Sequence, residues 1–310
     1  MRVVIVGCGS IGLRHATLAS AAGHDVMCVT RRNDIHMPHT AYLQEALQKP
    51  ADLVIIASPT DKHGSDLSEI HSVLTQNTSR VKRILVEKPL YALASQAPGL
   101  PGEDQPNIFV AYNLRFHPGI RRLHSLLAGK ILTHISFYAG QYLPDWRPGT
   151  DYRTCYSAVA EQGGGVLRDL SHELDLACYF SGPWQRMTAL GGRFSELEIS
   201  SDDTFTILSQ HAHCASVCIH LNYLDRIPRR EMVVQYSGGS AYLDLINNTL
   251  LWEGQSESFA VERNTTYQVQ LDAMLGSDEA LACTYAEGLE LVRFIEAAEK
   301  AAKERQWINR

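Results

Sequence analysis

The first third of the chain alternates short apolar runs with stretches in which apolar residues recur at helical spacing. The apolar runs occupy residues 2–6, 26–30, 51–58, 83–86 and 107–112. Between the first two runs, the stretch from Ser10 to Ala22 has the spacing of a helix. Strands that alternate with helices form a parallel sheet covered by helices. The pattern therefore predicts an α/β domain with a doubly wound parallel sheet over residues 1–118.

One segment of this domain departs from the pattern. The residues from Ala94 to Pro106 are rich in Pro, Gly and Gln, a composition typical of loops. We expect a loop there, in the place where a crossover helix would usually join two parallel strands.

The remainder of the chain, residues 119–310, contains runs of alternating apolar and polar residues, which are typical of half-buried strands. These runs cover residues 131–142, 186–194, 204–211, 215–221, 231–236 and 240–245. A final stretch, residues 278–300, has apolar residues at helical spacing. We predict a second α/β domain with a large, open and mostly antiparallel sheet. Helices would cover one face of the sheet and a second copy of the chain the other, so we expect a homodimer or a homotetramer.

Composition and charge narrow the function classes. The 310 residues carry a formal net charge of −6, with a pI near 6.1, which argues against a nucleic-acid partner. No run reaches the ~20 apolar residues that a membrane span needs. The first strand begins at once, which leaves no room for a signal peptide, and the seven cysteines are scattered like reduced thiols. We expect a cytoplasmic protein without a membrane partner.

No metal site is predicted. The run from His211 to His220 contains several His and Cys residues, which are common metal ligands. Alternation along one strand would send these side chains to opposite faces, so a single metal ion could not collect them.

Three glycines follow the first apolar run in the arrangement G-x-G-x-x-G, as Gly7, Gly9 and Gly12. In a strand–turn–helix unit the first glycine permits the tight turn, and the third lets the helix pack closely on the strand. The second lets backbone amides reach a diphosphate at the positive end of the helix. The motif predicts a dinucleotide-binding Rossmann domain, in which Ser10 and Ile11 also border the cofactor.

The second apolar run ends in Thr30, Arg31 and Arg32, where an acidic residue would accept hydrogen bonds from the adenine ribose of NAD. Arginine at this place pairs with the 2′-phosphate of NADP. The sequence therefore favours NADP, with NAD as the alternative. In that alternative both arginines are solvated loop residues and Asp34 turns inward.

Two further strand ends should border the cofactor, because open parallel sheets bind ligands at the carboxyl ends of their strands. The residues at or just beyond these ends are Ser58, Pro59, Thr60, His63, Glu87 and Lys88.

Five motifs occur in the order seen in one oxidoreductase family. They are Gly7-x-Gly9-x-x-Gly12, Ser58-Pro59-Thr60-x-x-His63, Glu87-Lys88-Pro89, Tyr112-Asn113-x-Arg115-Phe116-x-Pro118 and Gly163-Gly-Gly-Val-Leu-Arg-Asp169-Leu-Ser-His172-Glu-Leu-Asp175. With these motifs in register over nearly the whole chain, the sequence resembles the Gfo/Idh/MocA oxidoreductases, the glucose–fructose oxidoreductase and inositol dehydrogenase family. The resemblance implies hydride exchange between nicotinamide and a carbinol carbon, usually of a sugar or cyclitol.

The resemblance also implies roles for individual residues. Lys88 would contact the substrate hydroxyl, Asp169 and His172 would be the acid/base pair, and Asn113 and Arg115 would lie at the substrate. A neutral imidazole suits proton removal near pH 7, and an ammonium group stabilises a developing alkoxide.

Asp169 and His172 are three residues apart, so they share a face if one helix holds both. The family more often shows D-x-x-x-H, and the shorter spacing here is a departure from its pattern. In the alternative interpretation Asp169 is a helix N-cap and His172 is a buried structural residue.

The segment from Gly140 to Ser157 is dense in side chains that bind sugars and acids. Aromatic rings stack on sugar rings, and arginine forks grip carboxylates or phosphates. The segment is similar to that of family members linked to bacterial surface-polysaccharide and nonulosonic acid pathways, and its arginines favour an anionic sugar. In the alternative interpretation it is a rigid loop or an oligomer contact. The candidate substrate residues here and just beyond are Asp145, Trp146, Arg147, Tyr152, Arg153 and Arg168.

These features together predict an NAD(P)-dependent dehydrogenase or reductase that acts on a CH–OH group of a sugar or sugar derivative. A non-catalytic dinucleotide-binding sensor or regulator is the alternative from another class, because a fold does not guarantee chemistry. A third option is an aldose–aldose oxidoreductase with a tightly held cofactor. The presence of both Lys88 and His172 favours an enzyme.

Overall fold

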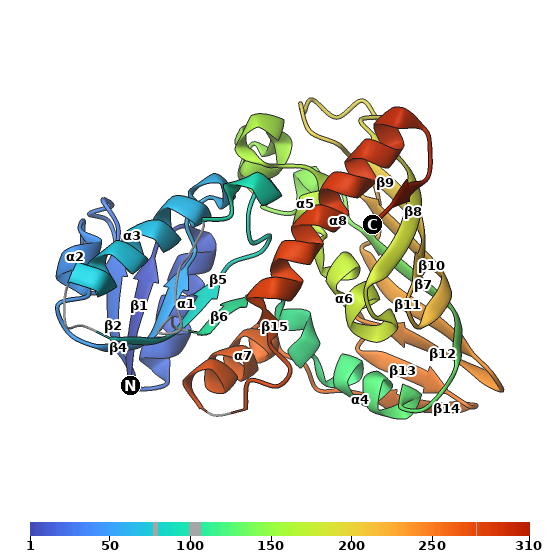
Figure 1. The fold of residues 1–310 in the computed structure, drawn as a ribbon, viewed down its shortest axis with the longest axis horizontal. Coiled ribbons are helices and arrows are strands. Elements are labelled where there is room, and N and C mark those ends of the chain that lie inside the picture. The colour runs from blue at the N-terminus through green and yellow to red at the C-terminus, as the bar shows by residue number, and fades with distance from the viewer. Residues whose placement is uncertain (77–79, 99–106, 277) are drawn as a thin grey trace. The chain divides into compact units, whose positions relative to one another are not determined.

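The chain forms two compact units in a computed structural model that describes residues 1–76, 80–98, 107–276 and 278–310. One unit comprises residues 1–113 and 264–292, and the other comprises residues 114–263 and 293–310 (Figure 1). The first segment of the first unit ends at residue 113, whereas the sequence analysis placed a domain boundary after residue 118. The return of residues 264–292 to the first unit was not predicted, because helical periodicity does not say which sheet a helix covers.

The first unit contains a seven-stranded sheet in the order β15-β6-β5-β4-β1-β2-β3. All strands pair in parallel except β15, which runs antiparallel to β6. The central strands β1 and β4 are apolar and buried along nearly their whole length, as expected where both faces of a sheet are covered. The strands are β1 (Arg2–Val6), β2 (Asp25–Val29), β3 (His39–Thr40), β4 (Ala51–Ile56), β5 (Val81–Val86), β6 (Asn107–Val110) and β15 (Cys283–Thr284).

Four helices belong wholly to the described part of this unit. They are α1 (Ser10–Ala21), α2 (Leu43–Ala46), α3 (His63–Gln76) and α7 (Thr265–Leu275), and α7 contacts both α1 and β4. Between β5 and β6 the described residues form a short 3₁₀ turn at Ala94–Gln96. Residues 99–106 of the predicted loop lie outside the described residues. The doubly wound parallel sheet predicted from the sequence is confirmed.

Four strands of this sheet end at the same level. Val6 pairs with Ile56, Ile56 pairs with Val86, and Val86 pairs with Val110. Neighbouring strands lie ~4.8 Å apart. The segments that follow β1, β4, β5 and β6 are therefore neighbours along one edge of the sheet.

The second unit contains a nine-stranded sheet in the order β14-β13-β12-β11-β7-β10-β9-β8-β16. Its neighbours are antiparallel except β7 and β10. This confirms the prediction of a large, mostly antiparallel sheet. The strands are β7 (Leu132–Gly140), β8 (Trp184–Gly192), β9 (Thr204–His211), β10 (Cys214–Asn222), β11 (Arg229–Tyr236), β12 (Gly239–Asp244), β13 (Thr249–Trp252), β14 (Gln255–Ser258) and β16 (Ile308–Asn309).

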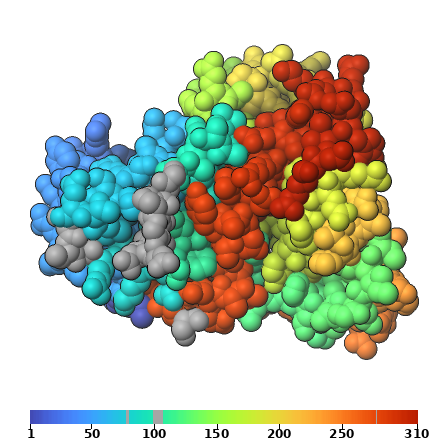
Figure 2. Space-filling view, in the orientation of Figure 1, coloured from blue at the N-terminus to red at the C-terminus, as the bar shows by residue number. Residues whose placement is uncertain are grey.

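Helices pack against this sheet on one side, where α4 and α6 lie beside it in Figure 1. These helices are α4 (Pro118–Leu127), α5 (Val166–Asp169) and α6 (His172–Ser181). Large apolar side chains of the sheet, including Leu190 and Leu208, are exposed. The last helix, α8 (Tyr285–Glu304), begins in the first unit and ends in the second, and its last turns form part of the red surface in Figure 2.

The His- and Cys-rich run is a hairpin and not one strand, which corrects the sequence-based interpretation. His211 ends β9 and Cys214 begins β10, with a turn between them. Within the described residues no three His, Cys, Asp or Glu side chains gather in a way that could hold a metal ion. No helix among them is long and apolar enough to cross a membrane.

Candidate functional site

The glycine-rich turn after β1 is shaped by close backbone approaches. Gly7 has φ of 90°, and a β-carbon there would lie 2.6 Å from the backbone nitrogen of Ser58. A β-carbon on Gly12 would lie 1.9 Å from the carbonyl oxygen of Gly7, so only glycine lets α1 start this close to the strand.

Gly9 has a different environment from the other two glycines. A β-carbon there would meet no described atom within 4 Å, and both Gly9 and Ser10 are exposed. The first turn of α1 contains no acidic residue. The partial positive charge of its backbone amides, including that of Ile11, is therefore not compensated by a side chain of that turn. This open turn fits a diphosphate held by backbone N–H groups.

The residues after β2 differ in whether another residue of the protein already binds them. Arg32 donates two hydrogen bonds to the carboxylate of Asp34, at 2.9 and 2.6 Å, and a third to the carbonyl oxygen of Cys8 at 2.7 Å. The guanidinium lowers the pKa of Asp34 to about 2. The hydroxyl of Thr30 accepts from the backbone nitrogen of Arg32 at 3.2 Å. Arg31 is exposed and makes no ion pair within the described part of the chain.

The segment after β4 is held by hydrogen bonds to its backbone and side chains. His63 is buried, with one ring nitrogen 3.0 Å from the carbonyl oxygen of Ser58 and the other 3.1 Å from that of Leu90. The Ser58 hydroxyl donates to Asp66, and burial raises the pKa of this carboxyl. Pro59 precedes the 3₁₀ turn that buried Thr60 opens. These contacts give His63 a role in shaping the turn that carries Ser58.

Glu87 and Lys88 directly follow β5, two strands from the glycine turn. Glu87 is buried, and its carboxylate lies 2.8 Å from the ring nitrogen Nε2 of His15 on α1. Lys88 is half-buried. His15 was not predicted as a site residue, because nothing in the sequence links a helix residue to a strand end 72 positions away.

Two residues predicted to contact the substrate are hydrogen-bonded to other residues of this chain. The Asn113 amide donates to the hydroxyl of Thr266 at 2.8 Å. Arg115 is 3% exposed and donates from two nitrogens to the carboxylate of Asp175, which is fully buried, at 2.7 to 3.1 Å. The Tyr179 ring also faces the guanidinium at 5.0 Å. This geometry favours a structural role for Arg115, because breaking a buried pair leaves an uncompensated charge.

The glycine run before α5 is explained by packing within the second unit. Gly163 has φ of 82°, and a β-carbon on Gly164 would lie 2.1 Å from the carbonyl oxygen of Tyr156. A β-carbon on Gly165 would lie 2.2 Å from the Asp202 carboxylate, which accepts from the Leu167 backbone nitrogen at 3.0 Å.

Asp169 and His172 lie in different helices, which corrects the expectation that one helix presents both. Asp169 is the last residue of α5 and His172 the first of α6. The N-cap of α5 is Gly165, so Asp169 is not the N-cap either. The buried hydroxyl of Tyr223 donates to Asp169 at 2.7 Å, and burial raises the pKa of this hydroxyl well above its ordinary value. The hydroxyl therefore stays protonated and fixes the carboxylate.

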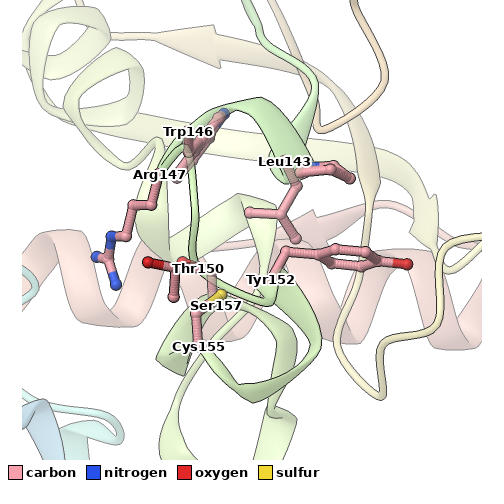
Figure 3. A pocket seen from close by; sticks show the side chains of 8 residues that line it. Leu143, Trp146, Arg147, Thr150, Tyr152, Cys155 and Ser157 are labelled. Carbon is pink, nitrogen blue, oxygen red and sulfur yellow. The ribbon is translucent and has the colours of Figure 1, made fainter.

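A small pocket lies beside this carboxylate–tyrosine pair. Trp146 lines it and meets the ring of Tyr223 edge-on at 5.1 Å, while its indole nitrogen donates to the Gln141 carbonyl at 3.2 Å. Figure 3 shows the side chains that surround the pocket, and the loop from Leu143 to Ser157 supplies all of them. The lining residues are Leu143, Pro144, Trp146, Arg147, Thr150, Tyr152, Cys155 and Ser157.

The three arginines predicted at an anionic sugar differ in their partners. Arg153 pairs with Asp151 and Glu198, and Arg168 pairs with Glu299. Arg147 lines the pocket, is exposed, and has no ion-pair partner among the described residues.

The other predicted residues of the loop lie nearby. Asp145 is exposed at the end of a 3₁₀ turn. The hydroxyl of Tyr152 accepts from the backbone nitrogen of Glu198 at 3.3 Å.

Comparison with known proteins identifies the second unit. Residues 120–242 match the family described as GFO/IDH/MocA C-terminal domain. The chain therefore carries a Gfo/Idh/MocA C-terminal domain, and the resemblance predicted from the sequence is confirmed. No curated protein matches the chain.

Solved structures show the same fold over the whole chain. GenD2 from gentamicin A biosynthesis, in complex with NAD, is 21% identical with a TM-score of 0.79, and the match covers 100% of this chain and 96% of GenD2. UDP-N-acetylglucosamine 3-dehydrogenase GnnA from Acidithiobacillus ferrooxidans is 19% identical, with a TM-score of 0.78 and 98% of each chain covered. The WlbA dehydrogenase from Bordetella pertussis, in complex with NADH and UDP-GlcNAcA, is 16% identical with a TM-score of 0.79, covering 100% of this chain and 98% of WlbA.

Proposed function

We propose that this chain, with its Gfo/Idh/MocA C-terminal domain, is an NAD(P)-dependent oxidoreductase that acts on a CH–OH group of a sugar derivative. The observation that carries the proposal is the common level at which β1, β4, β5 and β6 end. This common level places the open glycine turn and the Glu87-Lys88 segment along one edge of the sheet. Dinucleotide sites in open parallel sheets lie at such an edge.

The residues present fit a nicotinamide dinucleotide. The backbone amides of Gly9, Ser10 and Ile11 would hold its diphosphate, and the open side of Gly9 leaves room for it. When bound, the cofactor accepts or supplies the hydride. Arg31, whose guanidinium has no ion-pair partner in the part of the chain that the structure describes, would meet a 2′-phosphate, so the proposal includes a preference for NADP.

The protein's own residues would manage the proton and the charge. As the carbinol carbon is oxidised, the imidazole of His172 would take the hydroxyl proton, and the Lys88 ammonium would stabilise negative charge on the oxygen. In the reverse direction, reduction of the carbonyl carbon, His172 would return the proton, and Lys88 would again stabilise negative charge on the oxygen. Asp169, fixed by Tyr223, would orient the substrate hydroxyls or the base.

The proposed substrate is an anionic sugar derivative, such as a nucleotide-linked amino sugar or sugar acid. Arg147 on the pocket wall has a guanidinium that no described carboxylate neutralises. Two of the similar structures are described as a UDP-N-acetylglucosamine 3-dehydrogenase and as a complex with UDP-GlcNAcA. These two sugars are therefore the first to test.

A substrate screen tests the proposal. Acidic and amino sugars, free and nucleotide-linked, are mixed with each nicotinamide cofactor while nicotinamide absorbance is followed. We expect turnover with at least one anionic sugar. Tight dinucleotide binding without turnover of any sugar would support the sensor alternative instead. Nicotinamide that copurifies with the protein would support the aldose–aldose oxidoreductase.

A further inference from the structure

His15 joins the dinucleotide-binding helix to the strand end that carries Lys88. It lies on α1 three residues after Gly12, is 1% exposed, and places Nε2 at 2.8 Å from Oε1 of Glu87. A buried carboxylate is costly unless a partner compensates it. In the described part of the chain, His15 is the side chain in hydrogen-bonding contact with this carboxylate.

Glu87 has a second contact that reaches the proposed catalytic residue. Its other carboxylate oxygen, Oε2, accepts from the backbone nitrogen of Lys88 at 3.3 Å. Its own backbone nitrogen donates to the carbonyl oxygen of Ile56 at 2.8 Å, which ties the segment to β4. The carboxylate therefore links the imidazole of His15 to the backbone from which the Lys88 side chain projects.

The surroundings hold the imidazole in place. The ring of Tyr267 on α7 packs edge-on against His15, with ring centres 5.7 Å apart. The guanidinium of Arg14 lies 4.9 Å from the centre of the same tyrosine ring. Three elements, α1, α7 and the end of β5, therefore meet at one hydrogen-bonded pair.

We propose that His15 is a positioning residue: through Glu87 it fixes the backbone at Lys88 and so the placement of the lysine ammonium. This inference rests on the role of Lys88 in the proposed function. A misplacement of ~1 Å in a reacting group can cost up to ~100-fold in rate, so loss of the pair should appear in kcat. The cofactor would keep its contacts with the glycine turn.

The test compares two substitutions of His15 with a buried histidine elsewhere. His15→Leu removes the ring nitrogen, whereas His15→Gln keeps a hydrogen-bond donor of similar reach. His211→Gln is the matched control, because His211 is 2% exposed but lies on β9, with Gly182 and Ser209 as its partners. We expect kcat to fall ~10- to 100-fold in His15→Leu, to recover to within ~3-fold in His15→Gln, and to stay unchanged in His211→Gln. If His15→Leu does not fold, His15→Asn replaces it, because its amide is too short to reach Glu87.

A double substitution separates positioning from general destabilisation. If His15 acts through Lys88, His15→Leu should cost nothing further in the Lys88→Ala background. An equal loss in both backgrounds would overturn the inference, as would a loss of dinucleotide affinity with unchanged kcat at saturation.

A spectroscopic measurement reads Lys88 without turnover. Lysines are methylated with ¹³C, and the signal that disappears in Lys88→Arg is assigned to Lys88. We expect His15→Leu to shift this signal and His211→Gln to leave it in place, and an unshifted signal would overturn the inference. Full activity of Lys88→Ala would instead contradict the proposed function. Failure of the proposed function can therefore be distinguished from failure of the inference about His15.

Discussion

Arginine side chains in this chain differ in whether a carboxylate already holds them. Arg32 and Arg153 each form a two-pronged contact with an aspartate two residues away. Arg31 and Arg147 are exposed, and neither forms an ion pair with any described residue. A guanidinium already bound by a carboxylate has fewer donors left for a phosphate. Arg32 therefore serves as a control for Arg31, and Arg153 serves as a control for Arg147.

The first prediction concerns the cofactor. Arg31→Ala should weaken NADPH binding by ~10-fold or more and leave NADH binding unchanged, because a charged hydrogen bond to the 2′-phosphate is lost. Arg32→Ala should weaken both cofactors alike, since it removes a contact with the carbonyl oxygen of Cys8 in the glycine turn. Calorimetric titration of both variants with both reduced cofactors measures this. Tighter binding of NADH than NADPH by the unaltered protein would refute the preference.

The second prediction concerns substrate charge. Arg147→Ala should raise KM for an anionic sugar by ~10-fold with little change in kcat, since the contact is made equally in ground and transition states. Arg153→Ala should leave KM nearly unchanged and loosen its loop, because it loses Asp151 and Glu198. Kinetics beside size measurement on each variant separate these effects. A preference for an uncharged sugar, or a change of oligomer size in Arg147→Ala, would count against the assignment.

At the scale of elements, the N-terminus of α5 depends on the half-buried carboxylate of Asp202. Asp202 accepts from the backbone nitrogen of Leu167 in the first turn of α5, and burial raises the pKa of Asp202 to about 6. The folded protein then binds more protons than the unfolded chain between about pH 4 and pH 6. The contribution of Asp202 to stability is therefore greatest below about pH 4 and decreases as the pH rises through about 6.

The third prediction follows from this sign. Asp202→Asn keeps a side-chain oxygen as the acceptor but cannot ionise, so its stability relative to the unaltered protein should rise from pH 4 to pH 7. The change should approach about 3 kcal/mol at most, the equivalent of about two pKa units. Melting temperatures of both proteins across this range measure it, and all other titrating groups are common to both. A difference that stays constant with pH would disprove the prediction.

The sequence predicts elements where the local pattern is sufficient. The strand predicted at residues 204–211 is β9 with the same bounds, because its side chains alternate between buried and exposed. The break between α5 and α6 was not predicted, because no glycine or proline separates Asp169 from His172. The hairpin β13–β14 was also missed, because its strands have only four residues each.

The same distinction applies to the candidate site. The glycine motif is local, and the backbone approaches at Gly7 and Gly12 bear out the steric reasons given for those glycines. The pairs His15–Glu87 and Tyr223–Asp169 join residues 72 and 54 positions apart. Periodicity and motif spacing carry no information on such pairs, so only the folded chain reveals them.

At the scale of the whole molecule, the candidate catalytic residues are divided between the two compact units. Lys88 belongs to the first unit, whereas Asp169 and His172 belong to the second. The first unit also carries the glycine turn, so dinucleotide binding should depend on that unit. The two activities, cofactor binding and turnover, should therefore respond differently to substitution.

The last prediction uses this separation. Lys88→Ala and His172→Ala should each lower kcat by ~100-fold or more, because each removes a group that would act on the reacting hydroxyl. Dinucleotide affinity should change little, since the proposed diphosphate contacts are backbone amides. Lys82→Ala is the matched control for Lys88, because Lys82 lies on the strand that precedes Lys88, is exposed and pairs with Asp52 at 2.6 Å.

The measurement must also separate catalysis from folding at His172, which is 9% exposed at the start of α6. The melting temperature of His172→Ala, measured beside kcat and the NADPH dissociation constant, makes that separation. A melting temperature close to that of the unaltered protein, together with retained cofactor binding and lost turnover, is the expected result. Unfolding of His172→Ala at the assay temperature would favour the interpretation of this histidine as a buried structural residue, and the proton would then need another acceptor.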